Sequence, residues 1–331
     1  MAAFRVLVSV PIDFRGRAPA RDLLTSAGLE VVYPADRPAG TAEERRDRLA
    51  DIDAILAGME PLNGDTLCRA ERLRVIARNG VGYDAVDVAY CTGRGIVVTN
   101  TPGALSDAVA EETFGLILAL TRHLCDGDRA VKAGQYDVPY GEDLAVLTLG
   151  VVGGGQIGSE VVRRALAFKM RVLVHDPFVD PGRIRALGAE PVSLDDLLAS
   201  AEIVTLHLPL TPQSRHVVDA GFLARMKPGS LLVNTARGGI VDEEALIAAL
   251  QSGHLAGAGL DVQAAEPATG RSLDLVQLPN VVAMPHAGSK TWATRERMSV
   301  WAARSIVDLL QGRTPEHVVN REVLAGLEGL P

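Results

Sequence analysis

The stretch from residue 147 to residue 176 constrains the fold more than any other part of the chain. An apolar run ends at Val152, a glycine-rich turn spans residues 153–158, and a helical pattern then leads to a second apolar run and Asp176. Strand, glycine-rich turn, helix, strand and acid together make a dinucleotide-binding unit. Because the chain has 33 glycines, the position of the turn between two apolar strands carries this prediction, and the glycine pattern alone would not.

The glycines of this turn have separate expected roles. Gly153 permits the tight turn, Gly155 lets the backbone approach a pyrophosphate, and Gly158 lets the helix pack close to the strand. The helix, predicted to begin near Ser159, would offer unpaired amides and the positive end of its dipole to phosphates. The predicted cofactor-binding residues of the turn are Gly153, Gly155, Gln156, Ile157 and Gly158.

Asp176 bears on the choice of cofactor. It lies 18 residues after Gly158, near the spacing of about 20 residues expected for a carboxylate that binds ribose hydroxyls. A carboxylate repels a 2′-phosphate, and no cation follows before Arg183. The sequence therefore predicts NAD rather than NADP as the cofactor.

Composition narrows the class of protein. The 331 residues leave room for two domains, and 47% apolar residues are enough to build their cores. The net charge of −8 with no basic block argues against a nucleic-acid partner. We expect no targeting segment, no membrane span and no metal site, and the three scattered cysteines indicate reduced thiols in the cytoplasm.

Apolar runs alternate with helical patterns along both halves of the chain, which indicates parallel sheets covered on both faces. Strands are expected at residues 4–10, 29–33, 54–57, 73–77 and 96–99, and after the glycine-rich turn at 172–174, 203–206, 231–234, 257–260 and 281–283. Helices are expected at residues 21–27, 42–50, 65–70, 86–91, about 106–123, 243–250 and 292–310.

The predicted fold class is α/β, with two doubly wound parallel-sheet domains. A Rossmann-type NAD-binding domain, residues 101–286, would be inserted into a flavodoxin-like substrate-binding domain formed by residues 1–100 and 287–331. The first half lacks a closing element, and the helix at residues 292–310 would supply it.

Ligands bind beyond the carboxyl ends of parallel strands. In the strands expected after the glycine-rich turn, those ends carry His207, residues 234–237, Asp261 and His286. In the first half the equivalent end is residues 78–82, a glycine-rich turn with a free cation at Arg78. We expect a cleft with NAD on one wall and substrate on the other.

Three of these polar residues suit carbonyl reduction. Hydride transfer to a carbonyl leaves an alkoxide, which a histidine can protonate near neutral pH. A carboxylate beside a histidine favours its cation, and an arginine can hold a substrate carboxylate. Arg237, Glu266 and His286 fit these roles. By spacing alone, surface salt bridges and a structural histidine remain equally open.

The chain resembles the D-isomer-specific 2-hydroxyacid dehydrogenase family over nearly its whole length. The stretches that carry the resemblance are residues 79–84, 100–103, 153–158, 206–211, 226–229, 234–239, 260–267 and 278–286. The resemblance implies that His286 is the acid/base, that Glu266 pairs with it, and that Arg237 holds the 2-keto acid.

The resemblance also implies binding roles. The backbone of Val81 and Gly82 would bind the substrate carboxylate, with Arg78 and Asn79 near the far end of the substrate. Ala236 and Asp261 would contact the nicotinamide, and His207 and Thr211 the adenosine side.

The sequence leaves the identity of the 2-keto acid substrate open. Residues 58–61 and Arg78 are similar to those of enzymes for phosphoglycerate-like or hydroxypyruvate-like acids, whereas Ser289 and residues 294–298 resemble glyoxylate/hydroxypyruvate reductases. The alternative from another class is a non-catalytic NAD(H)-sensing interaction protein of the corepressor type. A formate dehydrogenase would have glutamine in place of Glu266, and phosphite oxidation is a further alternative.

Residues 124–146 form a long excursion that carries four proline or glycine residues together with Tyr136 and Tyr140. A solvated loop of this length is uncommon inside a compact domain. Family resemblance implies an arm that clasps a second subunit in a two-fold homodimer. A mobile surface loop is the alternative.

Overall fold

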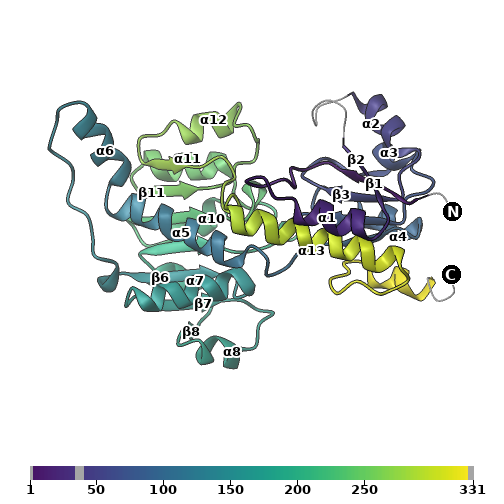
Figure 1. Cartoon of the computed structure of the whole chain (residues 1–331). Helices are drawn as coiled ribbons and strands as arrows, with labels where there is room; N and C mark the ends of the chain where they lie inside the picture. Colours follow the sequence, from purple (N-terminus) through teal and green to yellow (C-terminus); the bar gives the residue numbers. More distant parts are fainter. Residues whose placement is uncertain (1–2, 34–40, 327–331) are drawn as a thin grey trace. The chain divides into compact units, whose positions relative to one another are not determined.

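The computed structural model describes residues 3–33 and 41–326. The chain divides into two compact units, Met1–Leu105 with Lys290–Pro331, and Ser106–Ser289 (Figure 1). The unit boundaries fall a few residues after those predicted at 100/101 and 286/287, because hydrogen bonds tie the connecting residues to the preceding unit. The Thr101 amide donates to Gly80 of the first unit, and the Gly288 amide donates to Asp261 of the second. Residues 1–2, 34–40 and 327–331 of the predicted ranges lie outside the described residues.

The first unit contains a five-stranded parallel sheet with the order β2-β1-β3-β4-β5. This is the flavodoxin-like order. The strands are β1 Arg5–Val8, β2 Glu30–Val32, β3 Ala54–Ala57, β4 Val75–Arg78 and β5 Val97–Thr99. The helices are α1 Pro19–Ser26, α2 Ala42–Leu49, α3 Gly64–Leu67, α4 Val88–Gly93 and α13 Trp292–Leu310, with a 3₁₀ turn at Arg321–Gly326.

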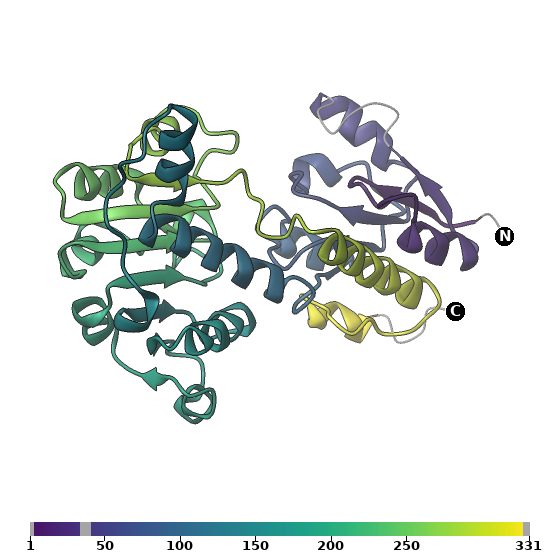
Figure 2. The same cartoon turned by 60° about the vertical axis from the view of Figure 1, so that its left-hand side comes forward.

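Side chains alternate between the two faces of this sheet, as a parallel strand buried on both sides requires. Val6, Leu56 and Ala77 face one core cluster, which α13 closes with Ala302 and Ile306. Leu7, Ile55 and Ile76 belong to a second cluster on the other face. The last long helix therefore completes the first unit, packed beside α1 (Figures 1 and 2).

The second unit contains a seven-stranded parallel sheet with the order β12-β11-β10-β9-β6-β7-β8. Read from β6, this is the Rossmann order 3-2-1-4-5-6 extended by one strand. The strands are β6 Thr148–Val152, β7 Arg171–His175, β8 Glu190–Pro191, β9 Ile203–Leu206, β10 Ser230–Asn234, β11 Leu255–Leu260 and β12 Val281–Ala283. The helices are α5 Ser106–Thr121, α6 Leu124–Lys132, α7 Gln156–Ala167, α8 Pro181–Ala186, α9 Leu194–Ser200, α10 Ala220–Arg225, α11 Glu243–Gln251 and α12 Arg271–Val276, with 3₁₀ turns at Leu144–Val146 and Gly238–Ile240.

Candidate active site

The turn between β6 and α7 has the backbone that a bound pyrophosphate requires. Gly153 has φ +103°, and a Cβ added there would meet the carbonyl oxygen of His207 at 2.5 Å. A Cβ at Gly158 would collide with the carbonyl oxygen of Gly153. At the N-cap of α7, Gly155 has open space around it and no side-chain cap. The first amides of α7 therefore have no side-chain acceptor at the cap, an arrangement that suits phosphate.

The helix begins earlier than predicted. α7 starts at Gln156, not near Ser159. Gln156 is exposed and Ile157 half-buried in its first turn. Both residues thus lie where the helix dipole acts on a bound anion.

Asp176 follows directly after β7, and its carboxylate is held from two sides. Oδ2 accepts from the Gly154 amide at 2.8 Å, and Oδ1 accepts from the Phe178 amide at 2.8 Å. Each carboxylate oxygen keeps a further lone pair, which can accept from a ribose hydroxyl. The residue thus links the glycine-rich turn to the end of the neighbouring strand.

His207 lies just beyond β9. Its Nε2 is 3.0 Å from Thr205 Oγ1, whereas the buried Nδ1 has no hydrogen-bond partner among the described residues. Burial lowers the pKa of His207 to about 3, so the ring is neutral near neutral pH. Thr211 makes a contact within its own loop, in which its amide donates to Ser214 Oγ at 2.8 Å.

Three loops at one edge of the second sheet carry the predicted trio. Arg237 follows β10, Glu266 follows β11 and His286 follows β12, and these three strands are neighbours. The carboxyl ends of parallel strands lie at the same edge of a sheet, so the fold brings the three loops together.

Within the trio, the imidazole of His286 is hydrogen-bonded to the carboxylate of Glu266, and the charge of Arg237 acts on the same carboxylate. His286 Nδ1 lies 2.8 Å from Glu266 Oε2, with side chains 30% and 34% exposed. Partial burial raises the pKa of Glu266, but the His286 hydrogen bond and charge, the Gln263 amide and the charge of Arg237 lower it overall. Arg237 Nη1 donates to the carbonyl of Ala236 at 2.7 Å. The carboxylate of Glu266 is therefore ionised.

Asp261 fixes the loop that carries His286. Its carbonyl accepts from the His286 amide at 2.8 Å, and its two carboxylate oxygens accept from Ala287 at 2.6 Å and Gly288 at 2.9 Å. His286 has φ +51°, which is unusual for a residue with a side chain. Burial and the charge of Asp261 raise the pKa of Glu112 on α5, which places a second carboxyl group near this tether. No pattern in the sequence indicates a role for Glu112.

Glu243 and Ser272 hold the loop that carries Glu266, and the sequence analysis did not single out either residue. Glu243 Oε1 accepts from the Ala264 amide at 2.9 Å, and Oε2 accepts from Ser272 Oγ at 2.7 Å. Ser272 Oγ in turn accepts from the Ala265 amide at 3.1 Å. Both side chains are buried. An acid at a helix start is ordinary in sequence, so only its burial reveals this role.

The predicted substrate residues Arg78, Asn79, Val81 and Gly82 belong to the first unit. The prediction of a free cation at Arg78 is wrong. Its side chain is buried, and Nη1 donates to the carbonyl of Asn79 at 2.7 Å. β4 lies beside β3, whose last carbonyl, that of Ala57, also faces the guanidinium at 3.4 Å.

The neighbours of Arg78 are better placed to meet a polar ligand. Asn79 is 4% exposed, and neither polar atom of its amide has a partner among the described residues. Unpaired buried polar atoms are rare and often mark a functional position. Val81 and Gly82 are half-buried, and the Val81 carbonyl accepts from the Asn100 side chain at 2.8 Å.

Comparisons with known proteins show the family of the chain. The family model for the D-isomer specific 2-hydroxyacid dehydrogenase NAD binding domain matches residues 114–288. A glyoxylate reductase of Korarchaeum cryptofilum is 40% identical over 285 residues, which are 84% of this chain and 86% of the relative. A glyoxylate reductase of Thermofilum pendens is 38% identical over 320 residues, 92% of each chain.

Solved structures show the same similarity. The glyoxylate reductase from Paecilomyes thermophila has a TM-score of 0.85 at 30% identity, covering 97% of this chain and all of the other. The D-lactate dehydrogenase of Aquifex aeolicus, solved with NAD and lactic acid, has a TM-score of 0.82 at 31% identity, covering 97% of this chain and 98% of the other.

The Rossmann-type sheet, its glycine-rich turn and these relatives define an NAD-dependent oxidoreductase. It transfers a hydride between NAD(H) and small 2-hydroxy or 2-keto acids. More narrowly, the chain belongs to the D-isomer specific 2-hydroxyacid dehydrogenase family. The non-catalytic alternative finds no support in the comparisons.

Proposed function

We propose that the enzyme reduces a small unphosphorylated 2-keto acid, of the glyoxylate or hydroxypyruvate kind, with NADH. The observation that carries the chemistry is the 2.8 Å contact between His286 and Glu266, with the charge of Arg237 acting on the same carboxylate. The substrate class is supported by relatives named glyoxylate reductase.

A phosphorylated acid fits less well. Arg78, the cation that would have favoured one, is buried against carbonyl oxygens. Glu60 is also engaged, because it accepts from Ser9 and from the Gly58 amide. These contacts tie residues 58–60 to their own unit.

The residues at the glycine-rich turn would hold the cofactor. The amides at the start of α7 would bind the pyrophosphate, Asp176 would accept from the ribose hydroxyls, and the His207 Nδ1, which has no partner among the described residues, would offer a further polar contact. NADH, when bound, supplies the hydride for the keto carbon. His207, which burial keeps neutral, would add no charge to a cofactor bound there.

The trio donates the proton and binds the carboxylate of the substrate. Arg237 binds the substrate carboxylate, as a guanidinium does in two parallel hydrogen bonds. His286 donates its proton to the oxygen of the keto group as that oxygen becomes an alcohol. Glu266, ionised, stabilises the protonated imidazole and fixes its orientation. In the reverse direction His286 takes the proton from the hydroxyl.

A panel of keto acids tests the proposed substrate. We expect kcat/KM with NADH to be highest for glyoxylate or hydroxypyruvate and lower for pyruvate and 3-phosphohydroxypyruvate. A phosphorylated acid that exceeds both would contradict the substrate class. Absence of turnover with every acid, in a protein that still binds NADH, would contradict the roles of the trio.

We also propose a two-fold homodimer formed by residues 124–146. α6 has no buried residue, and Leu124 and Val131 on it are 54% and 53% exposed. Tyr136 is 88% exposed, and Tyr140 is fully exposed beside a hollow of about 830 Å³ that Leu120 and Val281 also line. Exposed apolar groups gathered on one arm are typical of a surface that another subunit covers.

A cytoplasmic location is proposed from the cysteines. Cys68, Cys91 and Cys125 form no disulfide, and two of them are exposed. Unpaired exposed thiols are ordinary in a reducing compartment. Within the described residues, every helix is too short or too polar to cross a bilayer. Fractionation of cells that make the protein would test this location.

A further inference from the structure

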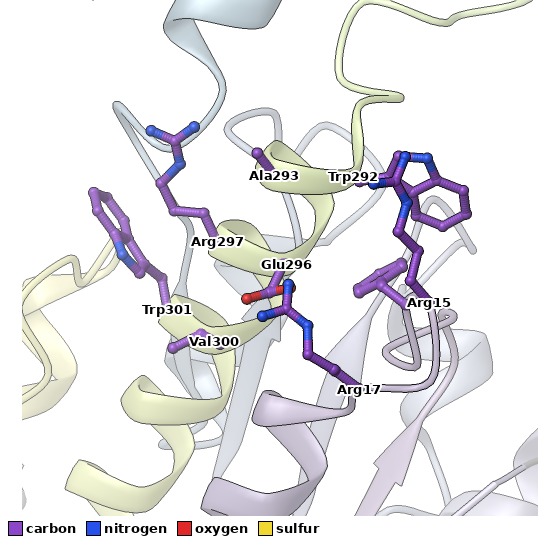
Figure 3. A pocket seen from close by; sticks show the side chains of 9 residues that line it. Arg15, Arg17, Trp292, Ala293, Glu296, Arg297, Val300 and Trp301 are labelled. Carbon is purple, nitrogen blue, oxygen red and sulfur yellow. The ribbon is translucent and has the colours of Figure 1, made fainter.

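The first unit has a concave site lined by none of the residues that the proposed reaction uses. A pocket of about 560 Å³ lies between the loop after β1 and the start of α13 (Figure 3). This volume falls within the range of roughly 300–1,000 Å³ found for small-molecule sites. It is lined by Phe14, Arg15, Arg17, Trp292, Ala293, Glu296, Arg297, Val300 and Trp301. None of these residues belongs to the trio or to the predicted substrate residues.

One side of the pocket is built by the helical repeat of α13. Residues four apart lie on one face of a helix. Two such rows line the pocket, one formed by residues 292, 296 and 300 and the other by residues 293, 297 and 301. Ala293 is the small member of its row and leaves room beside the Arg297 side chain.

The opposite side is a tight turn. The Phe14 amide donates to the Arg17 carbonyl at 2.7 Å, and the Arg17 amide donates to the Phe14 carbonyl at 3.0 Å. Arg15 and Gly16 between them have φ +51° and +75°. Positive φ at both central residues is the type I′ turn, a form that residues other than glycine, asparagine or aspartate rarely adopt. The turn places two arginines, Arg15 and Arg17, at the pocket.

The guanidinium of Arg15 stacks on the ring of Trp292, and its N–H donors remain available. Its guanidinium carbon lies 4.9 Å from the ring centre of Trp292, and Phe14 meets the same ring edge-on at 6.3 Å. Stacking uses the flat face of the guanidinium, so its N–H groups still point outward from the edge. Figure 3 shows the Arg15 side chain running alongside Trp292.

The pocket is positive in an acidic protein. Arg17 pairs with Glu296 at 2.9 Å, which leaves two uncompensated charges from three arginines. Arg297 has neither an ion pair nor a hydrogen bond within the part of the chain that the structure describes, and it is half-buried. The whole chain carries −8. Clustered guanidinium groups in a hollow attract anions and bind carboxylate or phosphate through paired donors.

We propose that this pocket binds a small organic acid with two or more anionic groups, carboxylates or phosphates. Arg297 and Arg15 take the charged groups, and the rings of Trp292 and Trp301 contact the carbon skeleton. The proposal goes beyond keto-acid reduction and does not depend on it.

Both tryptophans of the chain line this pocket, so intrinsic fluorescence reports its occupancy without turnover. The probes are propane-1,2,3-tricarboxylate and inorganic pyrophosphate, added at constant ionic strength with NAD present to fill the glycine-rich turn. Acetate is the single-charge control. We expect a saturable change with a multiply charged probe and none with acetate. Saturation by only one probe assigns the anionic group as carboxylate or phosphate.

Variants localise the effect. Arg297→Gln should weaken binding by roughly ten- to hundredfold, the range for a lost charge-assisted hydrogen bond. Arg304→Gln is the matched control, because Arg304 is exposed on the same helix outside the pocket. No saturable change with either probe, or equal affinity of Arg297→Gln and the unmodified protein, would overturn the proposal. Keto-acid turnover measured in parallel reports separately on the trio.

Discussion

At the residue scale, the proposed chemistry depends on a proton held at His286. His286→Ala should lower kcat for keto-acid reduction by roughly 10²-fold or more, the usual contribution of a general acid. NADH affinity should change little, because the cofactor residues lie on other loops. Steady-state kinetics and a fluorescence titration with NADH measure the two effects. Equal losses in both would point to a disturbed fold instead.

The charge of Glu266 sets the direction in which the pH profile of keto-acid reduction should move. The lowered pKa of Glu266 means that its carboxylate persists into acid solution and is lost only as pH falls through that lowered value. In Glu266→Gln the protonated imidazole loses this stabilising charge. The decline of reduction with rising pH should therefore begin at lower pH than in the unmodified enzyme. A pH profile of kcat that does not move would mean that Glu266 and His286 do not act as a pair.

Asp176 is expected to decide between the two nicotinamide cofactors. NADH should give a higher kcat/KM than NADPH, and Asp176→Asn should narrow the gap because the charge that repels a 2′-phosphate is removed. The amide retains one oxygen acceptor, which can keep one of the two contacts, that to Gly154 or that to Phe178. Asp180→Asn is the control, since Asp180 caps α8 four residues later. Equal values for both cofactors in the unmodified enzyme would refute this role.

At the element scale, the position of Glu266 depends on a buried bridge between α11 and α12. Ser272→Ala leaves the Ala265 amide and one oxygen of Glu243 without their partner. Leaving a buried polar group without its hydrogen-bond partner costs about 1–3 kcal/mol of folding stability. We expect a lower midpoint in urea and a pH profile displaced toward that of Glu266→Gln. Glu244→Gln, on the neighbouring exposed residue, should leave both unchanged. Lost stability with an unmoved profile would make the bridge purely structural.

The elements that the sequence located best are long or sharply bounded apolar runs. The predicted strands at residues 54–57, 203–206 and 281–283 and the helix at 292–310 have the observed limits. Besides the short helices α8, α9, α10 and α12, the prediction missed α6 and β8. α6 contains Gly127 and several charges and buries nothing, and β8 is only Glu190–Pro191, so neither leaves an apolar pattern.

The site residues could be predicted only where strand order brings their loops together. The sequence placed His286 and Glu266 after consecutive strands, and strand adjacency brings them to 2.8 Å. It could not show that Arg78 is buried, because the carbonyls that receive its guanidinium come partly from another strand. Nor could it show the bonds from Asp261 to the loop of His286, which depend on the order of β11 and β12.

At the scale of the whole molecule, the proposed dimer concerns the arm of residues 124–146, whose helix α6 has no buried residue. Leu124 and Val131 lie seven residues apart on α6 and therefore share a face. Light scattering should give twice the chain mass of 35.0 kDa at micromolar concentration. Leu124→Glu combined with Val131→Glu should give the single-chain mass, because two charges would be buried without partners.

Phe178→Glu is the matched control, since Phe178 is 96% exposed in the same unit but outside the arm. It should leave the mass unchanged. If the assembly completes the enzyme, activity should fall on dilution in step with dissociation. A single-chain mass for the unmodified protein at micromolar concentration would end the dimer proposal and make residues 124–146 a surface excursion of the monomer.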